Sequence, residues 1–496
     1  MFKEKKPNIL WFCADQMRYD MIQALGNDKI RTPNIDSLIQ TGIALENCYV
    51  QNQLCTPSRA SFLTGRYPAA HQVYRNGNAY FPKEEILVTK LLADSGYDCG
   101  LIGKLHLSTA SKFEKRPKDG YRFFSWCQNP QWERVPNSNA YWEWLRNEKG
   151  VDPKKLFKKN KPYLTTGIPA ELHQLTWCAD TAISFINEPR EGPWMLSVNP
   201  FDPHPPFDPP PEFHKKYNPT DMPPPLFKES DIRRQEMFAN VRSQKVKSVN
   251  PVLNKDDILT NELLIGDVSG SMPPEKFDGL GIKAAYFAMI ENIDNQLGRI
   301  IRHIKMKGQI ENTIIIFTSD HGELLGDHGL IYKGCKFFEG LVHIPLIFSW
   351  PGTYQNNKKT KALVETVDIA PTLLEACEIK IPYYMQGLSL HELLKGTKPI
   401  DYHKEVVVTD FNDSLGKGET DHFTQASMTF DGRYKLAVYH SHKGLGELYD
   451  LKEDPGEFDN LWNNRDFFDL KNKLISRHLD VLMKTIPPGV ERVAPA

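Results

Sequence analysis

The chain has 496 residues, more than one compact hydrophobic core usually holds, so we expect a large domain and a small one. Hydrophobic residues make up 40% of the chain and charged residues 25%, which is typical of a soluble globular protein and excludes a disordered one. Lys plus Arg total 61 and Asp plus Glu total 62, so the net charge is −1 and gives no reason to expect nucleic acid or an anionic membrane as a partner.

The amino terminus carries the charge of a signal peptide, but the apolar stretch at residues 9–14 is too short for one and runs into acidic residues. It therefore predicts a buried first strand. No stretch has the length of a transmembrane helix. The eight cysteines show no paired spacing, so we expect a cytoplasmic protein with reduced thiols.

Short apolar runs alternate with helical patterns along most of the chain. The predicted strands are residues 8–13, 98–102, 194–199, 313–318 and 345–350. The predicted helices are residues 89–95, 175–186 and 282–305, the last with a stripe of isoleucines. Continuous apolar strands separated by helices predict an α/β sheet buried on both faces.

The pattern changes after about residue 395. Strand-like pieces at residues 405–411, 426–430, 434–439 and 447–451 precede a helical pattern at 466–484, and Asp431-Gly432 predicts a hairpin turn. We therefore predict a large domain over residues 1–395. A small domain over residues 396–496 would hold an antiparallel sheet crossed by a helix.

Two long regions, residues 108–165 and 205–281, interrupt the alternation. Loops of this length in a folded enzyme are usually lids or binding walls. The first is rich in tyrosine and tryptophan between residues 121 and 144. These aromatic rings suit either stacking on sugars or packing within the lid, and packing is the preferred interpretation.

The most informative motif is Cys55 with the residues after it, in the run LCTPSRASFLTGR at residues 54–66. Pro57 fixes its own φ and favours an extended conformation in the residue before it, which suits modification of an unfolded chain. Arg59 lies one turn along a helix that we expect to begin near Ser58, so its guanidinium would point back at Cys55. A lone buried cysteine is usually structural, but the length of this motif argues against that interpretation.

Two strand ends each offer a carboxylate and a neutral ligand. Asp15 and Gln16 follow the first strand, and Asp320 and His321 follow the strand at residues 313–318. A polar pair at a strand end is commonly a helix cap, and sequence adjacency does not bring the two pairs together. If they meet, they can hold a hard divalent cation. An oxygen introduced by modification of Cys55 would be a further ligand.

Three further segments carry candidate basic residues. Lys104 and His106 follow a strand and would project to one side if the extended conformation continued. His204 lies between prolines that hold its ring rigidly. Lys333 lies in a glycine-rich loop, with Lys336 as the reserve candidate. Taken alone, each segment is equally consistent with a surface charge or an incidental turn residue.

Together these segments resemble the formylglycine-dependent sulfatases of the alkaline phosphatase superfamily. The resemblance implies a large mixed, mostly parallel sheet sandwiched by helices, with a smaller C-terminal antiparallel sheet and helix. It also implies that a maturase converts Cys55 to formylglycine, whose hydrated aldehyde attacks the sulfur of a sulfate ester held by the metal and the basic residues. His204 and Lys333 would assist the leaving oxygen, and His106 would help regenerate the aldehyde.

The metal pairs depart from the family pattern. Many sulfatases carry Asp-Asp and Asp-Asn where this chain has Asp15-Gln16 and Asp320-His321. The chain therefore has fewer carboxylates and a possible nitrogen ligand. Calcium is the first choice of cation from the resemblance, and manganese, magnesium and zinc become alternatives.

Two other functions compete with a sulfatase. Phosphonate monoester hydrolases of the same superfamily share the formylglycine and an Asp-Gln start, and phosphodiester cleavage belongs with them. Lys104 and His106 favour the sulfatase, because those enzymes generally lack this pair. A non-catalytic binding protein on the same fold is disfavoured by four intact residues: Cys55, Arg59, Asp15 and Asp320.

The substrate is predicted only by class. Arg75, Asn76 and Asn78 follow the Cys55 helix and are candidates to bind hydroxyls or a carboxylate of the substrate. A sulfated saccharide is the first expectation, with choline-type or aryl sulfates as alternatives. The residues give no indication of regiochemistry or of oligomeric state.

Overall fold

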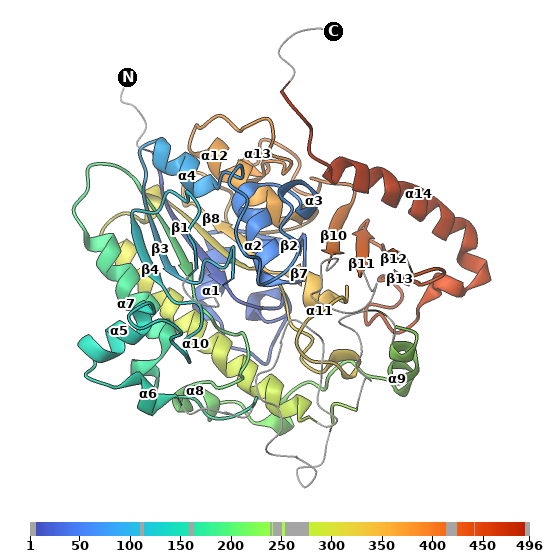
Figure 1. The fold of residues 1–496 in the computed structure, drawn as a ribbon, viewed down its shortest axis with the longest axis horizontal. Coiled ribbons are helices and arrows are strands. Elements are labelled where there is room, and N and C mark those ends of the chain that lie inside the picture. The colour runs from blue at the N-terminus through green and yellow to red at the C-terminus, as the bar shows by residue number, and fades with distance from the viewer. Residues whose placement is uncertain are drawn as a thin grey trace.

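The computed structural model of this protein describes residues 6–109, 114–157, 163–238, 241, 250–252, 277–412, 424–440 and 442–491. Within these residues the chain forms a nine-stranded sheet flanked by helices and a separate four-stranded sheet, as Figure 1 shows. The C-terminal helix α14 and the small sheet lie to one side of the large sheet.

The large sheet is mixed and mostly parallel. Its strands run in the order β4-β3-β5-β1-β6-β8-β2-β7, with β9 paired to β2. The strands from β4 to β6 in this order are parallel to their neighbours, and β2 is parallel to β9. The remaining pairs, β6–β8, β8–β2 and β2–β7, are antiparallel. The predicted fold class is therefore confirmed. The bounds are β1 Asn8–Ala14, β2 Gly42–Tyr49, β3 Asp98–Gly103, β4 Phe123–Trp126, β5 Trp194–Asn199, β6 Thr313–Ser319, β7 His343–Ile344, β8 Leu346–Ser349 and β9 Lys358–Glu365.

The central strand β1 contributes side chains to two separate cores. Ile9 and Trp11 belong to one buried cluster, and Leu10 and Phe12 belong to the other. Successive side chains of a strand point to opposite faces, so a strand that is apolar at every position must be covered on both sides. The sequence of β1 thus explains the sandwich of helices.

Helices cover the two faces of the large sheet (Figure 1). One layer contains α2 Cys55–Thr64, α4 Val88–Asp94 and α12 Ile369–Ala376, and the other contains α1 Pro33–Gln40, α7 Gln174–Asn187 and α10 Gly279–Met306. The three predicted helices correspond to α4, α7 and α10. Shorter helices are α3 Pro68–His71, α5 Ala140–Asn147, α6 Pro153–Leu156, α8 Pro211–His214, α9 Glu229–Glu236, α11 Glu339–Val342 and α13 His391–Lys395.

The carboxyl ends of four neighbouring strands lie side by side. Ala14 of β1 pairs with Ser319 of β6, so the residues that follow them leave the sheet at the same level. Gly103 of β3 pairs with Asn199 of β5 in the same way. The order β3-β5-β1-β6 therefore places four of the predicted functional segments along one edge.

The small sheet is antiparallel throughout. It consists of β10 Val407–Asn412, β11 Gln425–Phe430, β12 Tyr434–His440 and β13 Gly446–Asp450, followed by α14 Phe468–Thr485. The predicted hairpin is present, since the carboxylate of Asp431 accepts the amides of Arg433 and Tyr434. The existence of this second sheet is confirmed, and the predicted boundary between residues 395 and 396 stays a prediction.

Five aromatic residues of the first long region pack inside the protein. Tyr121, Trp126, Tyr141, Trp142 and Trp144 are each no more than 5% exposed. Tyr141 contacts Trp144 and Trp177 ring to ring. Packing is therefore the correct interpretation for these rings, and stacking on sugars is not.

Two further observations concern the whole chain. All eight cysteines lie within the described residues, are buried and form no disulfide. Among the helices that the structure describes, none is both long enough and apolar enough to span a bilayer. The predicted cytoplasmic location stays a prediction.

Candidate active site

Cys55 is the first residue of α2, so this helix begins three residues before the predicted start at Ser58. The amide of Ser58 donates to the carbonyl of Leu54, which closes the first turn around Pro57. Proline is tolerated in a first turn because its missing N–H has no intrahelical partner there. Thr56 is therefore helical in the folded chain, and the extended conformation that Pro57 favours at this position is overridden by the first turn of α2. The thiol is 1% exposed and faces the strand ends.

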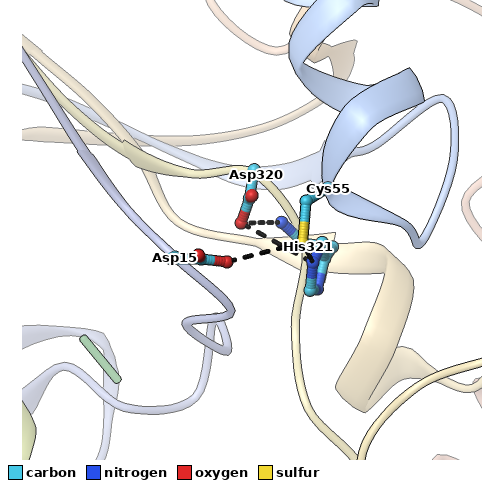
Figure 2. Close-up of side chains that lie close together, drawn as sticks. All are labelled: Asp15, Cys55, Asp320 and His321. Carbon is cyan, nitrogen blue, oxygen red and sulfur yellow. Dashed lines mark hydrogen bonds and ion pairs between the residues drawn. The ribbon is translucent and has the colours of Figure 1, made fainter. Parts of the chain in front are cut away.

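The two predicted metal pairs meet at Cys55. Figure 2 shows the side chains of Asp15, Asp320 and His321 pointing toward the Cys55 thiol. One potential ligand atom from each of these four residues lies within 4.8 Å of the others. Cys55 Sγ is 3.7 Å from Asp15 Oδ1 and 3.1 Å from His321 Nε2. The register of β1 and β6 thus joins residues that are about 300 positions apart in sequence.

The donor atoms fit a divalent cation. His321 Nδ1 lies 2.9 Å from the carbonyl oxygen of Gly322, which can only accept, so Nδ1 carries a proton and Nε2 is the ring nitrogen available to a cation. Carboxylate oxygens of Asp15 and Asp320 complete the set, and the amide oxygen of Gln16 lies beside it. Two carboxylates, an amide oxygen and an imidazole nitrogen are suitable ligands for a divalent ion.

Two buried lysines contact this ligand set. Lys104 Nζ forms an ion pair with Asp15 Oδ2. Lys333 Nζ lies 3.2 Å from Cys55 Sγ, 2.8 Å from Gln16 Oε1 and 3.4 Å from His321 Nε2. The reserve candidate Lys336 instead donates to Gln235 Oε1. The structure therefore brings Lys333, and not Lys336, to position 55.

Arg59 lies one helical turn beyond the thiol and is 1% exposed. Its Nε donates to Asp320 Oδ2 at 2.9 Å, and one terminal nitrogen donates to the carbonyl of Lys104 at 3.2 Å. Among the described residues, its other terminal nitrogen has no hydrogen-bond partner although it is buried. This unused donor is suited to an anionic oxygen of a ligand.

The local charges favour an anion at position 55. Burial raises the pKa of the Cys55 thiol, but the ammonium groups of Lys104 and Lys333 outweigh burial and hold this pKa well below its ordinary value. Burial also disfavours the charged form of Asp15, and Lys104 reverses that effect, so the pKa of Asp15 lies well below its usual range. The thiolate stands where a hydroxyl oxygen of a hydrated formylglycine would stand. The same cations would stabilise that oxygen as an anion.

The chain does not stay extended between Lys104 and His106. It turns after β3, with φ of 98° at Gly103 and 57° at His106, so the condition for both side chains to project to one side is not met. The buried carboxylate of Glu114 causes the turn, because it accepts the amides of His106, Leu107 and Ser108 in succession. His106 Nδ1 has no hydrogen-bond partner among the described residues.

His204 is held as the flanking prolines predict. Its Nδ1 donates to the carbonyl of Pro205 at 2.7 Å, and its ring lies 4.6 Å from that of Phe201. Burial, followed by the nearby ammonium of Lys333, lowers the pKa of His204 to about 3. The imidazole is therefore neutral in the unliganded site, with Nε2 as an acceptor.

The predicted substrate-binding residues form a turn beside α2. Asn76 Oδ1 accepts the amide of Thr56 at 3.0 Å, which satisfies a donor in the first turn of the nucleophile helix. Asn78 Nδ2 donates to the carbonyl of Arg75 at 2.8 Å. These contacts place the turn next to position 55, and the role of its residues in binding substrate stays a prediction.

Sequence reasoning missed three residues of the site. Ser58 Oγ donates to the carbonyl of Asp320, and Asn199 Nδ2 donates to the carbonyl of Lys104 at 2.9 Å. Glu323 accepts a hydrogen bond from Gln16 Nε2. The available signal was position, since Asn199 ends a predicted strand and Glu323 lies two residues after the predicted ligand His321.

Comparison with known proteins places the chain in a family. Residues 7–379 match the sulfatase family, and residues 326–484 match the C-terminal region of N-sulphoglucosamine sulphohydrolase. The chain is 29% identical to an arylsulfatase of Clostridium perfringens, over 96% of this chain and 95% of that one. It is 26% identical to an N-acetylglucosamine-6-O-sulfatase of Bacteroides thetaiotaomicron, over 95% and 85% of the two chains.

Among solved structures, a phosphonate monoester hydrolase of Agrobacterium radiobacter is similar, with a TM-score of 0.80 and 25% identity over 97% of this chain and 96% of that one. The sulfatase match covers most of the chain. This protein therefore belongs to the sulfatase family of the alkaline phosphatase superfamily, and it is a sulfuric ester hydrolase.

Proposed function

We propose that this protein hydrolyses a sulfate ester of a saccharide through a formylglycine that a maturase makes from Cys55. The observation that carries the proposal is the position of the thiol at the first residue of α2, among a metal-ligand set and within 3.2 Å of Lys333 Nζ. A structural cysteine usually packs among apolar side chains and not beside metal ligands and an ammonium group. The similarity to an N-acetylglucosamine-6-O-sulfatase supports a saccharide substrate.

The residues of the chain suggest how the sulfate ester is bound. The unpartnered nitrogen of Arg59 and the ammonium of Lys104 offer donors to the sulfate oxygens. Formylglycine supplies a hydrated aldehyde as nucleophile, and a cation held by Asp15, Gln16, Asp320 and His321 supplies Lewis acidity. Lys333, beside position 55, stabilises negative charge as it develops.

Proton transfer falls to the two histidines and Lys333. His204 is neutral before substrate binds, and a bound sulfate monoanion raises its pKa, so that the imidazolium can donate to the departing alcohol oxygen. Lys333 assists the same oxygen. His106, whose pKa burial and Lys104 hold well below its ordinary value, is neutral and suited to remove the proton that regenerates the aldehyde.

The nitrogen ligand bears on the choice of cation. Because His321 presents Nε2 and Gln16 presents a neutral oxygen, the donor set is softer than the all-oxygen set that calcium prefers. We propose manganese or zinc in place of calcium, the first expectation. Elemental analysis of protein purified without added metal tests this, and stoichiometric calcium would contradict it.

A phosphonate monoester hydrolase is the second candidate function. It is favoured by the TM-score of 0.80 to such an enzyme and by the Asp15-Gln16 pair. The sulfatase is better supported, since the sulfatase family matches residues 7–379 and the two sulfatase relatives cover 96% and 95% of the chain.

The experiment is a substrate panel with a matched control. The protein, co-expressed with a formylglycine-generating maturase, is assayed on sulfated N-acetylglucosamine, an aryl sulfate, an aryl phosphonate and a phosphodiester. Cys55→Ala, which no maturase can convert, is the control, and mass measurement of the Cys55 peptide reports conversion. Highest kcat/KM on a sulfate ester is expected. Preference for the phosphonate would favour the second candidate, and turnover of none by converted protein would refute both.

A further inference from the structure

Glu323 is a buried carboxylate that contacts the candidate metal ligand Gln16. Its Oε2 accepts a hydrogen bond from Gln16 Nε2, and both side chains are fully buried. A glutamine amide has a donor end and an acceptor end. The contact with Glu323 therefore decides which end of Gln16 faces the active site.

The opposite end of the same amide contacts Lys333. Gln16 Oε1 accepts from Lys333 Nζ at 2.8 Å. An ammonium group can only donate and a carboxylate can only accept, so these two neighbours fix one orientation of the amide. The backbone of Gln16 is also held, because its N–H donates to Asp320 Oδ1 at 2.9 Å and its carbonyl accepts from the Tyr286 hydroxyl at 2.6 Å.

The second oxygen of Glu323 holds the loop that carries Lys333. Glu323 Oε1 accepts the amides of Leu324 at 3.0 Å and Leu325 at 3.2 Å, and also the amide of Tyr332. Tyr332 directly precedes Lys333. One carboxylate thus fixes both partners of the Gln16–Lys333 contact.

We propose that Glu323 is a positioning residue that turns the amide oxygen of Gln16 toward the cation site. Among the described residues, its side chain hydrogen-bonds to Gln16 and to backbone amides, so it acts through Gln16 and the backbone next to Lys333. The inference rests on the proposed function for its purpose, since the oxygen it presents is a ligand for the catalytic cation.

We expect the substitution Glu323→Gln to turn over the side-chain amide of Gln16. Three backbone N–H groups on the Oε1 side require an acceptor, so the single oxygen of the new amide stays there and its NH2 group faces Gln16. Two NH2 groups cannot hydrogen-bond to each other, so the Gln16 amide turns over and presents its NH2 to Lys333. Gln16→Glu in the same protein supplies oxygen at both ends and removes the conflict.

The test measures Mn²⁺ binding to the whole chain, freed of metal with a chelator, by isothermal titration calorimetry. We expect E323Q to bind Mn²⁺ about 10- to 100-fold more weakly than the wild type. The double variant Q16E/E323Q, which keeps the net charge, is expected to recover most of that loss. Hydrolysis of a sulfate ester is measured in parallel on maturase-treated protein.

D294N is the matched control. Asp294 is a buried carboxylate that accepts the amides of Asn34 and Ile35 with one oxygen and the Asn34 side-chain amide with the other, so it has the same arrangement as Glu323 without a candidate ligand. D294N is expected to bind Mn²⁺ as the wild type does. An equal loss in D294N would show a general effect of removing a buried carboxylate and would overturn the inference.

The remaining outcomes also decide the question. Wild-type Mn²⁺ affinity in E323Q, or a folded double variant that binds no more tightly than E323Q, would overturn the inference. If E323Q does not fold, a folded double variant with wild-type affinity supports it and an unfolded one overturns it. If Mn²⁺ binding is weakened in E323Q and recovered in Q16E/E323Q but the wild type hydrolyses no sulfate ester, the proposed function alone is refuted. If the wild type is active but binds no Mn²⁺, this inference alone is refuted.

Discussion

Two buried clusters of charge in this protein differ in what their atoms leave unused. The active-site cluster gathers Asp15, Asp320 and His321 around Cys55, and a donor of Arg59 there has no partner among the described residues. In the second cluster, Lys435 of β12 is 1% exposed, and its ammonium is shared among Glu339, Glu457 and the carbonyl of Phe337.

The comparison shows that burial of charge is not by itself a sign of function. The ammonium of Lys435 has three donors and three partners, so the second cluster is complete and serves to join β12 to the segment containing α11. The active-site cluster instead brings different kinds of ligand atom to one point and leaves a donor over. Of these two clusters, the functional one is the one that combines several kinds of ligand atom with a spare donor.

A lysine-to-methionine substitution in each cluster distinguishes a functional cluster from a structural one. Lys333→Met is expected to lower kcat on a sulfate ester by about 10²- to 10⁴-fold, because it removes a charge beside the nucleophile. Stability should change little, since removing one ammonium from a site with several cations relieves repulsion. Kinetics and urea unfolding of the same preparation measure both quantities. Retained kcat in Lys333→Met would remove the distinction between the clusters.

Lys435→Met is expected to act in the opposite way. It leaves the buried carboxylates of Glu339 and Glu457 without their cation, so the free energy of unfolding should fall by about 3 to 5 kcal/mol. The kcat of the folded fraction should stay close to that of the wild type. Equilibrium unfolding in urea, with activity normalised to folded protein, provides the measurement. A large fall in normalised kcat would show that this cluster also takes part in catalysis.

The neutral histidine of α14 predicts a smaller, pH-dependent effect. His478 lies between the hydroxyls of Ser427 and Thr429, and burial, followed by the charge of His440, lowers its pKa to about 4. Since the unfolded pKa is about 6.5, this stability is fully present above pH 6.5 and is lost as the pH falls toward 4. Between pH 7.5 and 5 the wild type should lose about 2 kcal/mol more than His478→Gln does. Equal slopes in urea unfolding of the two proteins would contradict this.

An exposed ion pair gives the smallest expected effect. Lys90 and Asp94 are one turn apart on α4, and their side chains are 33% and 57% exposed. Lys90→Ala should change the free energy of unfolding by no more than about 0.5 kcal/mol, and the change should shrink further in high salt. Thermal unfolding at low and high ionic strength measures it. A cost comparable with that of Lys435→Met would show that burial does not set the difference between charged groups.

The central strands were predictable because they are apolar at every position. Five strands are buried on both faces and can be identified directly from the sequence: β1, β3, β5, β6 and β8. β2, β4, β7 and β9 were missed. Of these, β2 and β9 contain charged residues such as Glu46 and Lys361, so their sequences lack a continuous apolar run. Tertiary pairing, and not local pattern, makes them strands.

The site was predictable as a set of residue types but not in its connections. The strand-end pairs and Cys55 were identified from sequence, and the register of β1 with β6 supplies the contact that sequence adjacency could not show. The chain does not stay extended as far as His106, because Glu114, eight residues away, turns it there. Glu323 was missed as a partner of Gln16 because its significance lies in a hydrogen bond across 307 positions.

The distance along the chain between Cys55 and Lys333 has a consequence for protein synthesis. The two residues touch but are 278 positions apart, so at about 5 to 20 residues per second the ribosome needs roughly 14 to 56 seconds to make Lys333 after Cys55. Throughout that interval the thiol cannot be enclosed as it is in the finished protein. Translation itself thus provides a period in which a modifying enzyme can reach position 55, and a slower ribosome would lengthen it.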